Sequence, residues 1–347
     1  MATLWFAIAA VAIALYVVLD GFDFGAGILH LVVARTDDER RQVLGAIGPF
    51  WDGNEVWLLS AGGVLFLAFP KVLASGLSGF YFAIMLLLWV LILRGISLEF
   101  RSHVEDRMWR SFWDAVFALA STLAPVLFGA ALGNILRGVP LTAEGWFTLS
   151  LFESFSPWGR LGTLDWYTVL AGVLALVAIA HHGALFLSWK TDGAVRARSS
   201  AAAGTLFPAV IVLWIVATVA TIAVAPDTYA AWQSRPLAWL LTLIFGAALV
   251  STAGLRRRGH DLSAFLASSL FLLGALAATA ASVFPVMLRS ADDPALSLTA
   301  FNAASSPHAL ATALWWWPIG AALAVIYFAI LFRLHRGRVQ AGGEQSY

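Results

Sequence analysis

Residues 4–33 have the sequence LWFAIAAVAIALYVVLDGFDFGAGILHLVV, and this stretch decides the fold class. An α-helix rises about 1.5 Å per residue, so roughly 20 mainly apolar residues cross the hydrocarbon core of a bilayer. The stretch exceeds that length, and its only ionisable side chains besides Tyr16 are Asp20, Asp23 and His30. No Lys or Arg precedes Arg35, so the stretch lacks the charged start of a secretory signal peptide. We therefore predict a permanent membrane-spanning helix.

The composition extends this interpretation to the whole chain. Of its 347 residues, 61% are hydrophobic and 12% are charged, whereas soluble domains have about 25% charged residues. The net charge of +1 provides no basic field for nucleic acid. The absence of cysteine excludes disulfides, iron–sulfur clusters and thiolate metal sites. We predict an all-α integral membrane protein that forms a single polytopic domain over residues 1–347.

The chain contains nine apolar stretches that are long enough to be spans, joined by connections that we expect to be short and polar. The second stretch is the shortest. The predicted spans are residues 4–33, 54–70, 77–99, 113–136, 163–188, 205–225, 236–254, 263–287 and 311–334.

The distribution of Lys and Arg predicts the orientation, because cytoplasmic loops carry an excess of these residues. The loops after the odd-numbered spans, together with the C-terminal tail at 335–347 and its approach, contain fifteen of them. These are Arg35, Arg40, Arg41, Arg101, Arg107, Arg110, Lys190, Arg196, Arg198, Arg256, Arg257, Arg258, Arg333, Arg336 and Arg338. The alternate loops contain Lys71, Arg137, Arg160, Arg235 and Arg289. We therefore expect the N-terminus outside and the C-terminus in the cytoplasm.

Two acids in the first span are costly to place in a membrane. Asp20 and Asp23 are three residues apart, so they share one helix face. Closely spaced carboxyl groups in low-dielectric surroundings can exchange protons near neutral pH. Alternatively, the acids are structural and hydrogen-bond to another helix, with Gly21 and Gly25 allowing close helix packing. Both interpretations stay open at this point.

A second polar segment, WDGNEVW at Trp51–Trp57, lies at the inner end of the second span. Asp52 and Glu55 have the spacing of a helix capping box. They are also placed to collect protons from the cytoplasm, with Asn54 ordering water beside them. The two roles do not exclude one another.

The third span carries Arg94 about two turns inside its inner end, followed by Glu99. Arg94 either extends to the interface or pairs with one of the acids, and we favour a buried ion pair. For His30, His181 and His182 we favour polar or packing roles over haem ligation. These patterns alone fit a proton-coupled transporter, a channel or a subunit of a respiratory complex.

Short motifs within residues 1–140 resemble, in order and spacing, subunit II of cytochrome bd ubiquinol oxidase. The motif at Trp51–Trp57 is the most specific of them. They are DGFDFG at 20–25, WDGNEVW at 51–57, RGISLEFR at 94–101, Trp113-Asp114, GAALGN at 129–134 and GVP at 138–140.

The resemblance implies two four-helix bundles plus one peripheral helix, in the cytoplasmic membrane of a bacterium or archaeon. It implies an obligate heterodimer with subunit I, which carries two b-type haems and one d-type haem or a third b-type haem. This chain would bind no haem or metal. The complex would oxidise quinol and reduce oxygen, with membrane lipid around it. The family also includes members with a structural quinone in this subunit, and members with a small single-helix accessory subunit.

By the same resemblance, Asp52 is the first candidate for the proton pathway, followed by Asp20, Asp23 and Glu55. Some relatives have Gln at the position of Glu55. Structural or ion-pairing roles fall to Trp51, Asn54, Trp57, Arg94 and Glu99. The alternative functions are a stand-alone proton-coupled transporter and a purely structural scaffold. Transporters often contain internal repeats around a midplane site, and we find no clear repeat here.

Overall fold

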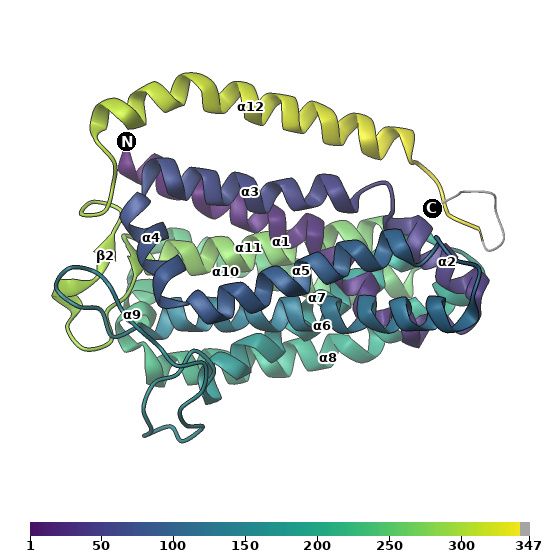
Figure 1. Ribbon diagram of the computed structural model, residues 1–347, viewed down its shortest axis with the longest axis horizontal. Coiled ribbons are helices and arrows are strands. Elements are labelled where there is room, and N and C mark those ends of the chain that lie inside the picture. The colour runs from purple at the N-terminus through teal and green to yellow at the C-terminus, as the bar shows by residue number, and fades with distance from the viewer. Residues whose placement is uncertain (341–347) are drawn as a thin grey trace.

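The computed structural model describes residues 1–340, which are almost entirely helical (Figure 1). The predicted tail at 335–347 lies partly outside the described residues. The helices are α1 (Ala2–Val33), α2 (Asp37–Ile47), α3 (Trp51–Ala68), α4 (Pro70–Gly79), α5 (Tyr81–Phe100), α6 (Arg107–Arg137), α7 (Trp166–Lys190), α8 (Gly193–Val224), α9 (Pro226–Ser234), α10 (Pro236–Arg257), α11 (Asp261–Val283) and α12 (Pro307–Leu334). A short antiparallel hairpin, β1 (Val286–Leu288) and β2 (Leu298–Thr299), precedes α12.

The number of spans agrees with the nine predicted ones. Within residues 1–340, eight helices are individually long and apolar enough to cross a membrane, and the bent pair α3–α4 makes the ninth. The axes of α3 and α4 differ by 119°. The bend follows from Pro70, since a residue before proline is pushed out of the helical conformation, and Phe69 has φ −139° and ψ 55°.

The helices divide into two groups of four with one helix apart. Helices α1, α3, α5 and α6 pack together, and α7, α8, α10 and α11 form the second group, with α1 and α6 against α7. Helix α12 runs along the edge beside α3 (Figure 1) and buries only Leu310 and Ala313. The predicted two bundles plus one peripheral helix are therefore confirmed.

Glycines bring the two bundles into backbone contact. A Cβ atom on Gly25 of α1 would lie 2.4 Å from the carbonyl oxygen of Ile179 and 2.6 Å from Cα of Gly183, both on α7. The close packing predicted for Gly25 is thus observed. It fixes the face of α1 that carries the two acids relative to the second bundle.

The connections are longer and more ordered than predicted. Residues 138–165 form an extended loop between α6 and α7, closed by the Arg137–Asp165 ion pair. The first inner connection contains the amphipathic helix α2, which begins with a capping box between Thr36 and Glu39. Two orphan N–H groups are satisfied by such a box, so this short polar helix is stable at its start.

Residues 335–340, which we call the tail latch, fold back onto the inner end of the bundle. Lys190 Nζ donates to the carbonyl oxygens of His335 at 2.5 Å and Gly337 at 3.2 Å. Val339 N–H donates to the Lys190 carbonyl at 2.7 Å, and Gln42 Nε2 donates to the Val339 carbonyl at 2.7 Å. The latch ties the end of α12 to α7 and α2.

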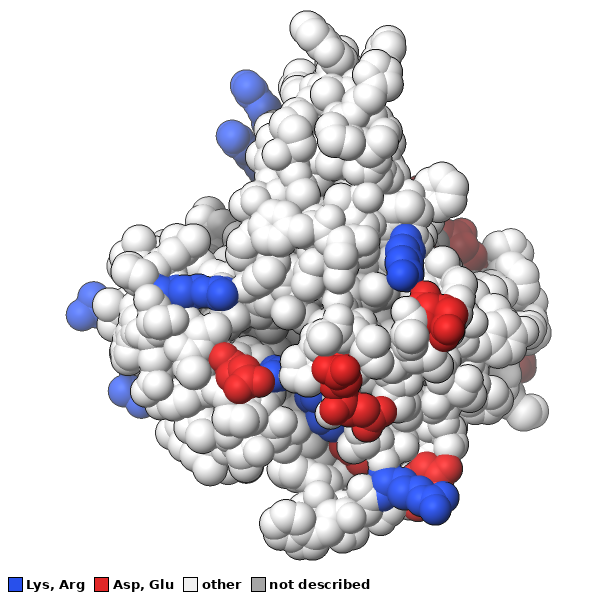
Figure 2. Space-filling view, turned by 90° about the vertical axis from the view of Figure 1, so that its left-hand side faces the viewer, with Lys and Arg blue, Asp and Glu red and all other residues white. Residues whose placement is uncertain are grey.

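The two ends of the molecule differ in charge. Figure 2 views the end that carries the N-terminus, where uncharged side chains predominate and scattered charges of both signs occur. The loops with fifteen Lys and Arg residues lie at the other end, which we call the inner end.

Candidate functional site

Three helices of the first bundle bring together the predicted polar residues near the inner end. We call Asp20 and Asp23 of α1, Asn54 and Glu55 of α3, and Arg94 of α5 the acid cluster. Arg94 Nη1 donates to Asp20 Oδ1 at 2.5 Å, and both side chains are fully buried. Arg94 Nη2 lies 3.1 Å from Glu55 Oε1, and the Glu55 side chain is 34% exposed. One guanidinium therefore links two carboxyl groups from different helices.

Asp23 has a different partner from Asp20, although the two acids share a helix face. Asn54 Nδ2 donates to Asp23 Oδ2 at 2.7 Å and to the carbonyl oxygen of Leu19 at 3.0 Å. The ring of Phe24 lies 4.3 Å from the Arg94 guanidinium. A cation over an aromatic face is stabilised by the ring quadrupole. Asp20, Glu55 and the Phe24 ring thus surround the Arg94 cation, while the Asn54 amide holds Asp23.

Asp52 lies outside this buried group. It is exposed, in the first turn of α3. The helix is capped by Phe50 without a side-chain hydrogen bond, so Asp52 and Glu55 do not form the capping box that their spacing allowed. A carboxylate in the first turn is still favoured by the helix dipole. Asp52 is therefore a solvent-accessible acid one turn from Glu55.

The remaining predicted residues flank the cluster. The ring of Trp51 packs close to Gly95 of α5, and Trp57 lies 6.1 Å from the ring of Phe328 on α12. Glu99 is exposed. It lies five positions after Arg94, so it points to another face of α5, because a helix has 3.6 residues per turn.

A second polar group at the inner end was not predicted as a unit. His30 Nε2 lies 2.6 Å from Asp114 Oδ1, and Arg101 Nε donates to the same oxygen at 2.6 Å. Arg40 Nη1 donates to Asp114 Oδ2 at 2.9 Å. No local pattern in the sequence predicts that His30, Arg101 and Asp114 meet, because they come from different helices or helix ends.

Asp37 of α2 completes this group at the surface. It accepts from Arg101 at 2.7 Å, from Arg41 at 3.0 Å and from Arg110 at 3.1 Å. Partial burial opposes ionisation, yet the hydrogen bond from Arg101 and the neighbouring Arg charges hold the pKa of Asp37 below its ordinary value. These ion pairs fasten α2 to the ends of α5 and α6.

Both ring nitrogens of the buried residues His181 and His182 lie within hydrogen-bonding distance of protein atoms. His181 Nδ1 lies 3.1 Å from the carbonyl oxygen of Ala203. His182 lies 2.7 Å from Ser268 Oγ and 3.0 Å from the carbonyl oxygen of Val18. Among residues 1–340, no group of three His, Cys, Asp or Glu side chains could hold a metal ion.

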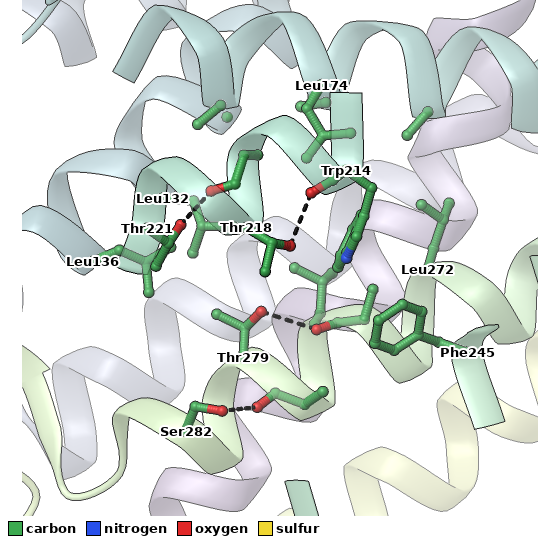
Figure 3. A pocket seen from close by; sticks show the side chains of 18 of the residues that line it. Leu132, Leu136, Leu174, Trp214, Thr218, Thr221, Phe245, Leu272, Thr279 and Ser282 are labelled. Carbon is green, nitrogen blue, oxygen red and sulfur yellow. Dashed lines mark hydrogen bonds between the residues drawn. The ribbon is translucent and has the colours of Figure 1, made fainter. Parts of the chain in front are cut away.

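A cavity of about 290 Å³ lies mainly within the second bundle (Figure 3). No His or Met lines it. Two of its hydroxyl groups bond within their own helices: Thr218 donates to the Trp214 carbonyl at 2.8 Å and Thr279 to the Ala275 carbonyl at 2.9 Å. The cavity therefore presents an apolar surface.

Comparison with known families decides the assignment. The model of the family described as cytochrome bd terminal oxidase subunit II matches residues 1–335. The chain belongs to this family. As a subunit II, it is a multi-pass membrane component of an oxidoreductase complex that includes haems and a subunit I.

Named relatives cover nearly the whole subunit. Cytochrome bd-I ubiquinol oxidase subunit 2 of Escherichia coli (strain K12) is 30% identical over 366 aligned positions, with 97% of this chain and 94% of the relative covered. Cytochrome bd ubiquinol oxidase subunit 2 of Bacillus subtilis (strain 168) is 31% identical, covering 88% and 87%. A chain in the structure of bd oxidase from Geobacillus thermodenitrificans has the same fold, with a TM-score of 0.74, 20% identity and coverage of 96% and 98%.

Proposed function

We propose that this subunit II carries protons from the cytoplasm toward oxygen chemistry in subunit I, and that it binds no haem itself. The observation that supports this most strongly is a row of acids with decreasing exposure. Asp52 is exposed, the Glu55 side chain is 34% exposed, and Asp20 and Asp23 are buried. Such a row allows a proton to pass from water into the membrane in short steps.

Arg94 makes the buried part of this row energetically possible. An isolated charge in the membrane core costs about 2.5–3.5 kcal/mol on insertion scales. Two carboxyl groups, those of Asp20 and Glu55, pair with the single guanidinium of Arg94, and the Asp23 carboxyl group accepts from Asn54 beside them. One negative charge is thereby paired at all times, while the other carboxyl groups are free to exchange protons. A purely structural ion pair needs only one acid.

The position of the cluster favours uptake at the inner end. Asp20 and Arg94 lie toward the end of the bundle that holds the Arg-rich loops. With the orientation inferred from these loops, the N-terminus lies outside, the C-terminus in the cytoplasm and Asp52 at the cytoplasmic surface. The family assignment disfavours a stand-alone transporter.

The exposed side of Glu55 supports a docking surface for subunit I. Its neighbours on α3, Val56 and Leu59, are 56% and 75% exposed, so this face is not covered by the rest of the chain. A carboxyl group facing hydrocarbon is costly. We infer that subunit I covers this face beside α12 and receives the protons there.

We place the haems of the complex, two b-type and one d-type or a third b-type, in subunit I, since both ring nitrogens of His181 and His182 already lie within hydrogen-bonding distance of protein atoms. The apolar cavity of Figure 3 would suit the isoprenoid tail of a structural quinone. Such a ligand would stabilise the second bundle, away from the acid cluster. We assign no site to an accessory subunit.

The variant Asp52→Asn in the complex with subunit I tests the proton pathway. The amide keeps the shape and hydrogen-bonding capacity of the side chain but cannot titrate. We expect normal haem spectra with slower quinol oxidation and slower generation of membrane potential in proteoliposomes. The matched control is Asp38→Asn, which alters another exposed acid of the inner end. If Asp52→Asn and Asp20→Asn both behave like the control, the pathway is wrong.

A further inference from the structure

The loop between α6 and α7 contains an apolar segment that the proton pathway does not use. Residues 150–164, which we call the aromatic loop, have the sequence SLFESFSPWGRLGTL. Phe152, Phe155 and Trp158 are all exposed, and Trp158 is 94% exposed. Glu153 and Arg160 are the charged residues of the segment, and their charges cancel. The aromatic loop therefore presents three large rings to its surroundings without a net charge.

The base of the aromatic loop is fixed to the end of α6. Thr163 N–H donates to the Ser150 carbonyl oxygen at 2.8 Å, which closes the loop. Asn134 Nδ2, at the end of the GAALGN motif, donates to the Thr163 carbonyl oxygen at 2.8 Å. Arg137 Nη2 donates to the Gly162 carbonyl oxygen at 3.2 Å. These bonds hold the loop in a defined position relative to the bundle.

The aromatic loop lies beside the spanning helices and does not extend past their ends. It turns back along the bundle axis until it is level with the part of α8 near the outer end, which is the end opposite the inner end (Figure 1). A cavity of about 240 Å³ is lined by Leu151 and Leu164 of the loop together with Leu127 of α6. Leu127 is ten positions before Arg137, which is about 15 Å along the helix. The base of the loop therefore covers a side of the bundle at the depth of the membrane.

We propose that the aromatic loop is a membrane anchor, and that Phe152, Phe155 and Trp158 insert their rings among the lipid headgroups at the outer end of the bundle. Aromatic rings with a polar edge concentrate at this level of membrane proteins. Trp and Phe also form the inserted face of segments that lie in a membrane interface. The partner is thus the lipid surface itself. The proposal does not depend on the proton pathway.

The neighbouring surface identifies lipid as the partner. Helix α8 exposes Val216, Val219 and Ile222 along its outer half, and such a surface faces hydrocarbon in a protein that spans a membrane. The face that we propose for subunit I lies beside α12, at the opposite edge of the molecule (Figure 1). The rings of the aromatic loop therefore continue a surface that lipid covers.

The backbone of the loop limits how deeply it inserts. Among residues 154–160, one backbone–backbone hydrogen bond forms, from Gly159 N–H to the Ser156 carbonyl oxygen at 2.9 Å. An irregular chain cannot lie in hydrocarbon, because its remaining N–H and C=O groups would have no partner there. The headgroup region supplies water to these groups while it accepts the rings. The loop consequently lies in the interface and not in the membrane core.

The absence of cysteine from the chain makes a depth measurement direct. Ser156→Cys keeps all three rings and places a single thiol of this subunit in the aromatic loop, where a fluorescent maleimide is attached in the complex with subunit I. Nanodiscs of phosphatidylcholine carry a nitroxide either at the headgroup or deep in the acyl chain, and iodide is the aqueous quencher. We expect strong loss of fluorescence with the headgroup nitroxide and weak loss with the other two. The parental complex, treated with the same maleimide, corrects for thiols of subunit I.

Ala295→Cys is the matched control, because Ala295 is exposed on another connection at the outer end. Its probe should be quenched by iodide and not by either lipid. If iodide quenches the probe at Ser156→Cys as strongly, the loop lies in water and the anchor is wrong. Protection from all three quenchers means that protein covers the loop, which also overturns it.

A combined variant tests whether the rings hold the loop in place. Adding Phe155→Ser and Trp158→Ser to Ser156→Cys removes two exposed rings without disturbing the base of the loop. We expect the probe to lose most of its quenching by the headgroup nitroxide and to become accessible to iodide. Unchanged quenching by lipid would overturn the anchoring role of these side chains.

Discussion

Replacing Gly25 by alanine should destabilise the contact between the two bundles. The new Cβ atom would lie 2.4 Å from the Ile179 carbonyl oxygen and 2.6 Å from Cα of Gly183. Ordinary contacts are about 3.5–4.0 Å, so α1 and α7 have to separate by about 1 Å. Overpacking typically costs about 1–3 kcal/mol. Because the obstacle is backbone and cannot rotate away, we expect the upper end, about 3 kcal/mol.

The measurement is unfolding of the purified complex by SDS, followed through tryptophan fluorescence. Gly246→Ala is the matched control, because it also lies inside a spanning helix but a Cβ atom there meets nothing within 4 Å. It should be neutral or stabilise by up to about 1 kcal/mol through helix propensity. If Gly25→Ala unfolds at the same SDS concentration as Gly246→Ala, the backbone contact between α1 and α7 does not exist as described.

Three further predictions concern charged side chains. Arg94→Met leaves Asp20 buried without its partner and should lower the free energy of unfolding by about 3–5 kcal/mol; SDS unfolding measures this, and an unchanged midpoint would contradict the pair. Lys190→Met leaves two carbonyl oxygens of the tail latch without a donor, so hydrogen exchange of residues 335–340 should accelerate, and parental exchange rates would argue against the latch. The lowered pKa of Asp37 gives stability that is present above its ordinary pKa of about 3.9 and lost on further acidification. Asp37→Asn should therefore lower the unfolding midpoint more at pH 6 than at pH 3, and equal effects at both would refute this role.

The spans were predictable because length and hydrophobicity are local properties of the sequence. The row of acids on α1 was predictable for the same reason, since a spacing of three residues places Asp20 and Asp23 on one face. Two local signals mark helix ends that hydrophobicity alone does not reveal. Pro70 ends α3 within a stretch that stays apolar, and the Thr36–Glu39 box starts α2 within a stretch that stays polar.

Partners that come from distant segments could not be predicted. Arg94 and Asp20 are 74 positions apart and His30 and Asp114 are 84 positions apart, so only the packing of α1, α5 and α6 brings them together. Helix rotation likewise decided which acid met Asn54. A single sequence shows which residues share one face of a helix. It does not show how that helix is rotated relative to the helices packed against it.

The backbone contact at Gly25 and Gly183 has a consequence for motion during turnover. Two helices whose main chains touch can neither slide nor roll past one another without a steric clash. The backbone positions of Asp20 and Asp23 are therefore held in place. Any movement that opens or closes the proton pathway has to come from elements without such a backbone contact. Helix α12, which buries only Leu310 and Ala313, meets less steric resistance to movement between its N-terminal end and the tail latch than α1 does.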